Sequence, residues 1–255
     1  MNFLHFPFYI SFEKIPVFNF CTTRHGGVSL LPFSTCNTGF NTNDKFENIV
    51  ENRIIVSKRL GIPVENFVLL KQVHSDKIHY VSEKDCRKFL DIPAIEGDAM
   101  FTDQSHIAIA VTLADCVGVI IYCPDKNIVG VCHSGWKGTL LNICGKLVDN
   151  LVKNCGCDSG KIIAGISPAI CKNCYTVGCE IVQSFPSQYS CHIFENHDGW
   201  HIDLKGIVVS QLIEKGVEKE NIFSSDICTY ENTHIFYSHR AEKNTGRFMF
   251  GISIF

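Results

Sequence analysis

The chain has little charge for its length and no strong excess of either sign. Of its 255 residues, 19% are charged and 45% are hydrophobic, and the formal net charge is −3. This composition is typical of a compact globular protein and argues against a large disordered part. The near balance of charge, with a pI of about 6.4, lacks the basic footprint of a protein that binds nucleic acid or an anionic membrane.

Long apolar runs, a secretory signal and linkers are also missing. No run of about 18 apolar residues occurs, so we expect no membrane span. The N-terminal stretch MNFLHFPFYISFEKIPVF has neither the basic start nor the small-residue cleavage site of a signal peptide. We therefore predict a cytoplasmic protein whose 14 cysteines are mostly reduced. Without a repeat or a Pro/Gly/Ser-rich linker, the chain is expected to form a single domain over residues 1–255.

The periodicity of apolar residues predicts a mixture of helices and strands without strict alternation. Helices are expected over 45–60, with Asp44 as N-cap and Gly61 closing the helix, and over 138–156, 175–185 and 204–217. Residues 96–135 are expected to form three strands, the last two joined as a hairpin by the PDKN turn. The class that this pattern favours is α+β, with a mixed β-sheet core and flanking helices.

Three ligand-type side chains occur in similar settings along the chain. Cys116 lies in VTLADCVGVIIY, His133 lies in VGVCHSGWKG 17 positions later, and His74 follows KQV. The predicted hairpin would bring Cys116 and His133 side by side at one end of the sheet. One thiol and two imidazoles are what a catalytic zinc site needs when its fourth position is left for water or substrate.

For each of these residues taken alone, packing is the favoured explanation. Cysteine is among the most buried residue types and usually behaves as a small hydrophobe. With 14 Cys and 11 His in the chain, coincidental pairs are expected. The same two interpretations, a metal or redox pair or scattered thiols, apply to CGC at Cys155–Cys157 and to CKNC at Cys171–Cys174.

Several segments together resemble one known family. TTRHGGVS, NTGFNTNDKFENIVENR, QVHS, GDAM, TLADCVGVIIY, HSGWKG, SPAI with CYTVG, and YSHRAEKNTGRF resemble, in order, the YfiH-type laccase-domain proteins. This family was once described as multicopper polyphenol oxidases and is now regarded as purine nucleoside phosphorylases with adenosine deaminase activity. Two local departures concern the substrate contacts: GISPAICKNCYTVG stands where a GPAIGPCCYEVG-like stretch is common, and YSHR carries a single Arg where two are common.

The resemblance implies a YfiH-like fold, which is also similar to that of toxin deamidases of the cytotoxic necrotizing factor type. It implies that His74, Cys116 and His133 bind Zn²⁺ and that purine nucleosides and phosphate are the substrates. Beside Cys116 and His133, we expect catalytic roles for Asp98, in proton transfer or ligand support, and for Arg24, whose Gly26-Gly27 loop could hold phosphate.

Further candidates have weaker chemical support. Asp115 is a second carboxylate candidate and Arg240 a second phosphate-binding candidate, whereas Arg53 is expected to be structural. The H-x-E…P-C-x-x-C signature of the zinc cytidine and adenine deaminases is absent. The sequence leaves the preferred nucleoside and the oligomeric state open.

Three other functions remain as alternatives. Cys116 as a nucleophile with His133 as its base would make a cysteine hydrolase or deamidase. A peptidoglycan-editing enzyme is a further possibility within the resemblance. A copper-dependent polyphenol oxidase is disfavoured, because laccase chemistry needs several coppers with many His ligands and the sequence offers only two ligand histidines.

Overall fold

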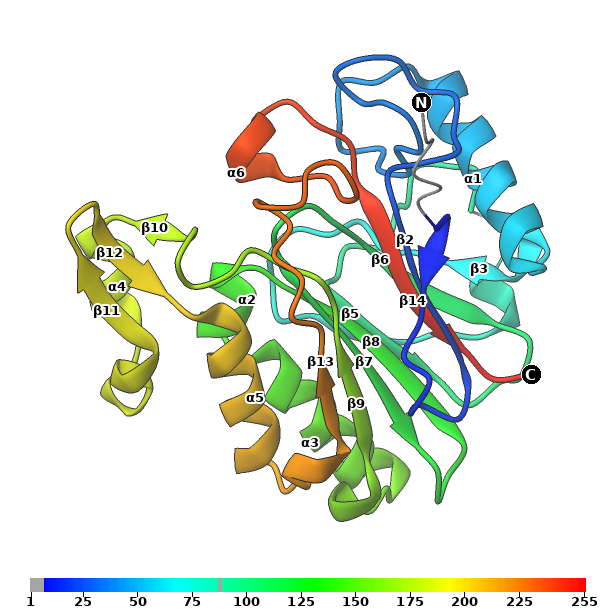
Figure 1. Cartoon of the computed structure of the whole chain (residues 1–255). Helices are drawn as coiled ribbons and strands as arrows, with labels where there is room; N and C mark the ends of the chain where they lie inside the picture. Colours follow the sequence, from blue (N-terminus) through cyan, green and yellow to red (C-terminus); the bar gives the residue numbers. More distant parts are fainter. Residues whose placement is uncertain (1–6, 87–88) are drawn as a thin grey trace.

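The fold is seen in a computed structural model that describes residues 7–86 and 89–255. Two large β-sheets face each other, and helices cover both outer faces (Figure 1). The expected α+β class is confirmed. The expected mixed β-sheet core is divided between these two stacked sheets.

The first sheet has five strands in the order β1-β2-β14-β6-β3. Their bounds are β1 Tyr9–Ile10, β2 Phe18–Thr22, β14 Phe248–Ser253, β6 Ala108–Leu113 and β3 Phe67–Val68. Its outer face packs on helix α1, Phe46–Leu60, through a cluster that includes Phe20, Val56 and Phe67.

The second sheet has six strands in the order β13-β9-β7-β8-β5-β4. Their bounds are β13 Ile222–Ser224, β9 Ile163–Ile166, β7 Val117–Cys123, β8 Ile128–Ser134, β5 Ala99–Thr102 and β4 Ile78–Tyr80. Its outer face is covered by α3, Ile143–Cys155, and α5, Leu204–Glu214, with α2, Trp136–Leu140, at one end. The predicted hairpin is confirmed, because β7 and β8 pair from Val117↔Ser134 to Cys123↔Ile128.

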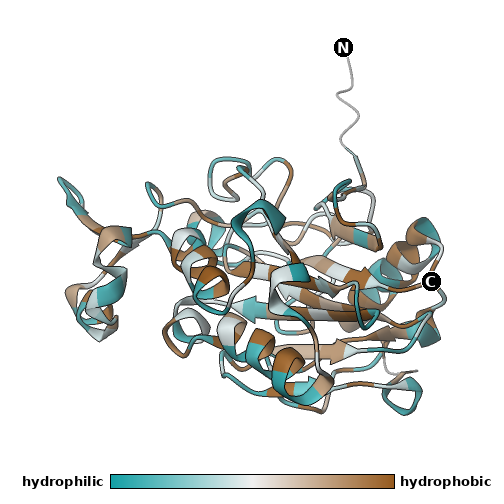
Figure 2. Ribbon diagram, turned by 90° about the horizontal axis from the view of Figure 1, so that it is seen from below, coloured by the Kyte–Doolittle hydropathy of each residue, from teal (hydrophilic) through white to brown (hydrophobic). Residues whose placement is uncertain are grey.

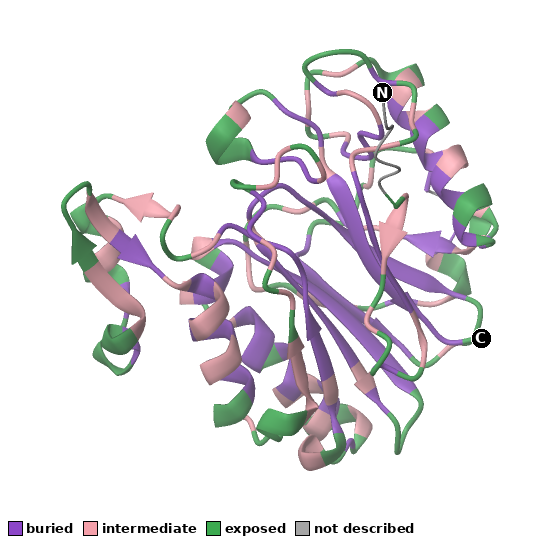
Figure 3. Ribbon diagram, in the orientation of Figure 1, coloured by how far each residue is buried: buried purple, intermediate pink, exposed green. Residues whose placement is uncertain are grey.

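The inner faces of the two sheets form a common core. Ile109 and Phe250 from the first sheet lie in one cluster with Ile120 and Val131 from the second. These strands are buried along nearly their whole length (Figure 3), and their apolar residues lie between the helical layers (Figure 2). Burial on both faces explains why the strands read as continuous apolar runs.

A third, small sheet projects from one side of the sandwich (Figure 1). It has the order β10-β12-β11, with β10 Thr176–Val177, β12 Gly199–Ile202 and β11 Ile193–Asn196. Helix α4, Cys179–Ser184, packs beside it, and α6, His239–Glu242, is a short turn before β14. The helix expected over 175–185 is therefore a strand followed by a shorter helix. No helix of the described residues is both long and apolar enough to cross a membrane.

Three local expectations need correction. The residue at the N-cap of α1 is Lys45, and Asp44 precedes it and accepts from the Lys45 amide; Gly61 ends the helix with φ 71° as expected. The helix expected over 138–156 is split into α2 and α3 by Asn142, which adopts φ 56°. Residues 96–135 form four strands instead of three, because the run IAIAVTLADCVGVIIYC is broken between β6 and β7.

The break between β6 and β7 is where the chain crosses from the first sheet to the second. Asp115 adopts φ 86° at this point, a left-handed conformation that aspartate tolerates better than most residues. Its carboxylate accepts hydrogen bonds from the Thr229 hydroxyl at 2.7 Å and the Arg240 amide at 2.6 Å. Asp115 therefore shapes the crossing that carries Cys116.

Candidate metal centre

The candidate site lies where the chain passes between the two large sheets. His74 is on the segment from β3 to β4, and Cys116 is on the segment from β6 to β7. The segment from β13 to β14 carries Arg247, and each of these three segments joins a strand of one sheet to a strand of the other. His133 is added by β8, whose partner β7 places Gly118 opposite it.

The structure brings His74, Cys116 and His133 together. One ligand atom from each lies within 4.8 Å of the other two, and the two imidazole rings are 4.7 Å apart between centroids at 71°. His133 is buried, Cys116 is half-buried and His74 is exposed. Three donors that converge from separate segments, with one of them open to solvent, fit a metal ion with a free coordination position.

Asp98 supports two of these ligands at once. Its Oδ1 lies 2.8 Å from Nδ1 of His133. The carboxylate also accepts from the backbone N–H groups of Val73, His74 and Ser75 at 3.2, 3.0 and 2.6 Å. It thereby holds the loop on which His74 adopts φ 57°. A carboxylate on the far nitrogen of a ligand histidine fixes the tautomer and orientation of that ring.

Neighbouring groups of the site shift the pKa values of Asp98 and His133. Burial opposes the ionisation of Asp98, but hydrogen bonds from His133 and Ser75 outweigh it and lower the pKa of Asp98 to about 2. Burial lowers the pKa of His133, yet its interactions with Cys116 and Asp98 raise that pKa to about 9. The surroundings of His133 therefore favour positive charge at this position.

A pocket of about 170 Å³ opens above the three ligands. It is also lined by Arg247, His239, Gln72, Thr112 and Asn41. Arg247 is the cation of this pocket, and its Nη1 donates to the carbonyls of Thr245 and Gly246 at 2.9 and 2.8 Å. Burial lowers the pKa of Arg247, whereas Cys116 and Asp115 counteract that shift.

Sequence reasoning missed Arg247 as a site residue. It is the arginine of NTGRF, within a segment that carries the family resemblance, but its spacing to the other site residues gives no signal. Only the return of the chain from β13 to β14 brings it beside Cys116.

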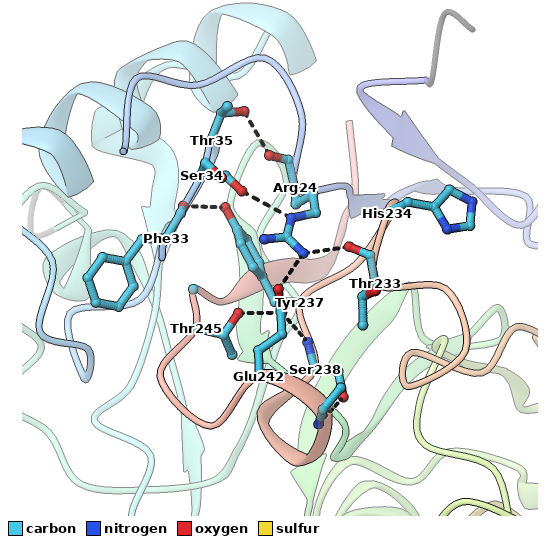
Figure 4. A network of polar contacts seen from close by, with 12 residues as sticks. Arg24, Phe33, Ser34, Thr35, Thr233, His234, Tyr237, Ser238, Glu242 and Thr245 are labelled. Carbon is cyan, nitrogen blue, oxygen red and sulfur yellow. Dashed lines mark hydrogen bonds and ion pairs between the residues drawn. The ribbon is translucent and has the colours of Figure 1, made fainter. Parts of the chain in front are cut away.

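The guanidinium of Arg24, which we expected to bind phosphate, contacts groups of the protein itself. It donates to Glu242 Oε1 at 2.9 Å, to the Ser34 carbonyl at 3.0 Å and to the Thr233 carbonyl. It also lies over the ring of Tyr237, 4.6 Å from the centroid (Figure 4). Arg24 ties the loop after β2 to the segment before β14, and it is not among the residues that line the described pocket.

The glycine loop after Arg24 is also engaged. The amide of Gly27 donates to the Thr35 hydroxyl at 3.2 Å, and the amide of Val28 donates to Asn52 Oδ1 at 2.8 Å. A Cβ on Gly27 would lie 2.3 Å from the Asn52 side chain. Close packing against Asn52 of α1 explains why position 27 is a glycine. Because the amides of this loop bond to protein groups, they do not support an anion-binding site beside Arg24.

The remaining candidates lie as follows. The Arg240 side chain is exposed, stacks 5.0 Å from the Tyr175 ring and donates to the Thr176 carbonyl at 2.6 Å. Arg53 is buried, donates to the Thr38 and Phe89 carbonyls, and lies over Phe40. The expected structural role of Arg53 therefore agrees with its contacts.

Comparison with known proteins gives one consistent family. The family model described as multi-copper polyphenol oxidoreductase laccase matches residues 18–254. The chain belongs to this family. The structure is similar to that of the Bacillus licheniformis protein YfiH, with a TM-score of 0.90 at 31% identity over 93% of this chain and 92% of that one.

Curated relatives with named activities are similar along most of the chain. A protein named purine nucleoside phosphorylase YlmD, from Bacillus subtilis, is 32% identical over 89% of this chain and 85% of its own length. One named adenosine deaminase RL5, from an unknown prokaryotic organism, is 30% identical over 91% of this chain and 92% of its own length. The resemblance to YfiH-type proteins and the α+β fold are thus confirmed, and the relatives indicate an enzyme.

Proposed function

We propose that this protein is a zinc-dependent purine nucleoside phosphorylase that also deaminates adenosine. The observation that carries the proposal is the convergence of His74, Cys116 and His133 with the guanidinium of Arg247 on one pocket. The names of the relatives from Bacillus subtilis and the unknown prokaryote support the substrate class. A purine nucleoside and phosphate, or a purine nucleoside and water, are the proposed substrates.

The donor set favours one zinc ion with an open position. Bound there, zinc would lower the pKa of a water ligand and polarise a substrate oxygen. Asp98 occupies Nδ1 of His133, so Nε2 is the nitrogen left to bind the ion. Multicopper chemistry would need several ions and many His ligands. Among the described residues, the two clusters with metal-ligand geometry contain only two histidines.

Phosphorolysis needs a cation beside the reacting sugar, and we assign that role to Arg247. A phosphate oxygen forms the new bond to the anomeric carbon as the glycosidic C–N bond breaks, and the leaving base takes up a proton. The products are the free base and ribose 1-phosphate. The Arg247 guanidinium would hold the phosphate through charge-assisted hydrogen bonds, and the partial burial of Arg247 strengthens such an interaction.

The purine base has a suitable apolar wall next to the ligand pocket. A second cavity of about 190 Å³ is lined by Phe40, Leu69, Leu70, Ile92 and Pro93. The two cavities share Asn41, Gln72 and Thr112. Ligand pockets typically measure about 300–1,000 Å³, and the two adjoining cavities reach this size only together. We therefore propose that the base lies toward Phe40 and the ribose toward Arg247.

A cysteine hydrolase is the second candidate, and a specific geometry favours it. Cys116, His133 and Asp98 form the order of nucleophile, base and orienting carboxylate that covalent catalysis uses. This interpretation gives His74 no task. A zinc site requires His74, so the zinc content of a His74 variant distinguishes the two candidates.

We also propose that the protein is located in the cytoplasm. All 14 cysteines lie among the described residues, and all are free thiols. Free thiols in this number are typical of proteins in a reducing compartment.

The phosphate role is tested by quantifying free base, ribose 1-phosphate and inosine formed from adenosine with and without phosphate. In zinc-loaded protein, Arg247→Ala should lower phosphorolysis by roughly 10²-fold, the usual loss for one charge-stabilising donor. Deamination should fall much less, because it uses no phosphate. Arg24→Ala is the matched control and should affect both activities equally.

Two results would contradict this proposal. Equal loss of both activities in Arg247→Ala would remove Arg247 from the phosphate role. No conversion of adenosine, inosine or guanosine by the zinc-loaded wild type would refute the functional assignment.

A further inference from the structure

A second cluster of potential metal ligands lies away from the three residues of the candidate centre. Cys171 and Cys174 are on the segment between β9 and β10, and Cys228 and Glu231 follow β13. One ligand atom from each of the four lies within 4.8 Å of all the others. These are the CKNC cysteines of the sequence together with two residues that no sequence spacing connects to them.

The parallel pairing of β9 and β13 explains why these segments meet. The strands pair from Ile222↔Ala164 to Ser224↔Ile166. The two chains leave the sheet together, joined by a bridge between Ala169 and Cys228 and by a hydrogen bond of 3.1 Å from the Thr229 amide to the Ala169 carbonyl. CKNC begins two residues after Ala169. The backbone therefore fixes the meeting of the four side chains.

The distances among the four side chains match those around a tetrahedral ion. Zn–S bonds of about 2.3 Å place two thiolates of a tetrahedral site about 3.8 Å apart. Sγ of Cys171 lies 3.4 Å from Sγ of Cys174, which lies 3.6 Å from Oε1 of Glu231. The Cys171 amide donates to Sγ of Cys228 at 3.3 Å. Backbone donors of this kind support metal-bound ligands from outside the coordination sphere.

We propose that Cys171, Cys174, Cys228 and Glu231 form a second, structural zinc site. Three thiolates and a carboxylate are soft and anionic enough to select Zn²⁺ over Mg²⁺ or Ca²⁺. Two cysteines separated by two other residues, as in CKNC, are the usual first half of a structural zinc site. With four protein ligands the site is closed, and its role is to brace the chain.

The braced segments adjoin the segment that carries Cys116. The amide of Ile170 donates to the Asp115 carbonyl at 3.0 Å, and the hydroxyl of Thr229 donates to Asp115 Oδ1 at 2.7 Å. Ile170 precedes Cys171, and Thr229 follows Cys228. A metal ion in the cluster would thus hold in place the two segments whose residues, Ile170 and Thr229, donate hydrogen bonds to Asp115.

A redox disulfide between Cys171 and Cys174 is the competing use of the same pair. It would draw the sulfurs from 3.4 Å to about 2.05 Å. It would give no role to the third thiol, which is 3% exposed, or to the Glu231 carboxylate. The arrangement of all four groups is accounted for by the metal site alone.

Zinc stoichiometry after reconstitution and desalting tests the proposal by elemental analysis. The reduced wild-type chain should hold about two zinc ions, one at each cluster. Cys171→Ser should lose one of them, and Cys191→Ser, which changes an exposed cysteine outside both clusters, should lose none. His74→Ala should lose the other ion, which separates failure of this site from failure of the candidate centre.

Cobalt substitution gives a second readout for variants that fold poorly. Three of the four proposed thiolate ligands belong to the second site, so most of the thiolate-to-cobalt charge-transfer absorption should remain in His74→Ala and disappear in Cys171→Ser. One zinc ion per wild-type chain, with no loss in Cys171→Ser, would overturn the proposal. So would a Cys171–Cys174 disulfide found by mass spectrometry in protein kept with zinc and a reductant.

Discussion

Asp98 shows how one buried side chain can organise a site. It is 1% exposed and joins His133 to the backbone of the loop that presents His74. Because the pKa of Asp98 is lowered to about 2, its contribution to stability is complete above its ordinary pKa of 3.8 and is lost as the pH falls toward 2. At neutral pH the carboxylate is therefore a fixed acceptor for both histidine segments.

Substitution of Asp98 by asparagine should weaken metal binding. The amide of Asp98→Asn keeps the size of the side chain but can place an N–H group against backbone donors. We expect zinc affinity to fall by about 10–100-fold, as for other partners of ligand histidines, in a competition titration with a chelator. Asp103→Asn is the control, because Asp103 lies just beyond the other end of β5 and accepts from the Tyr80 hydroxyl. Unchanged zinc affinity in a folded Asp98→Asn protein would refute this role.

At the scale of single residues, the sequence predicts which candidate ligands meet better than it predicts the groups around them. The types and strand-end positions of Cys116 and His133 point to the candidate metal centre, and a hairpin of predictable length brings the two residues together. Arg24 and Arg247 are both arginines, and the sequence alone does not show which of them faces the pocket. What distinguishes them is their partners, since Arg24 has Glu242 nearby and Arg247 faces the pocket.

The elements show why a continuous apolar run can hide a change of direction. The run IAIAVTLADCVGVIIYC has no glycine or proline at its break, and both halves are buried on two faces. The periodicity therefore gives no sign that β6 and β7 belong to different sheets. The change of direction occurs at the single left-handed residue Asp115. The partners of its side chain lie more than 100 positions away in the sequence, so local sequence does not reveal them.

The split between α2 and α3 has a similar cause and can be tested. Asn142 adopts a left-handed conformation, and its side chain accepts from the Gly145 amide at 3.1 Å to cap α3. Asn142→Ala removes the cap, at about 1 kcal/mol, and strains the backbone by a further 1–2 kcal/mol, roughly. At about 2–4 °C per kcal/mol for a chain near this size, Tm should fall by several degrees in a thermal melt.

Asn142→Gly provides the comparison for this measurement. Glycine adopts the left-handed conformation without strain, and a glycine N-cap costs only a few tenths of a kcal/mol, roughly. The glycine variant should therefore melt close to the wild type. Equal destabilisation by glycine and alanine would show that backbone conformation does not determine this boundary.

At the scale of the whole molecule, the candidate centre depends on two stacked sheets. The segments that carry His74, Cys116 and Arg247 all run from one sheet to the other at the same end of the sandwich. A single flat sheet would not bring these three segments together. The α+β class follows from the apolar pattern, whereas the stacking depends on long-range pairings such as β14 with β6, which local sequence does not encode.

The most direct test of the central claim compares zinc content and adenosine turnover in the wild type and in His74→Ala. The measurements are elemental analysis and product quantification on the same samples, before and after removal of metal with a chelator. We predict that the wild type loses both adenosine-converting activities on chelation and regains them with zinc, and that His74→Ala lacks the zinc of this centre and both activities. Full activity in a His74→Ala protein that lacks this zinc would contradict the account and favour catalysis by Cys116 and His133 alone.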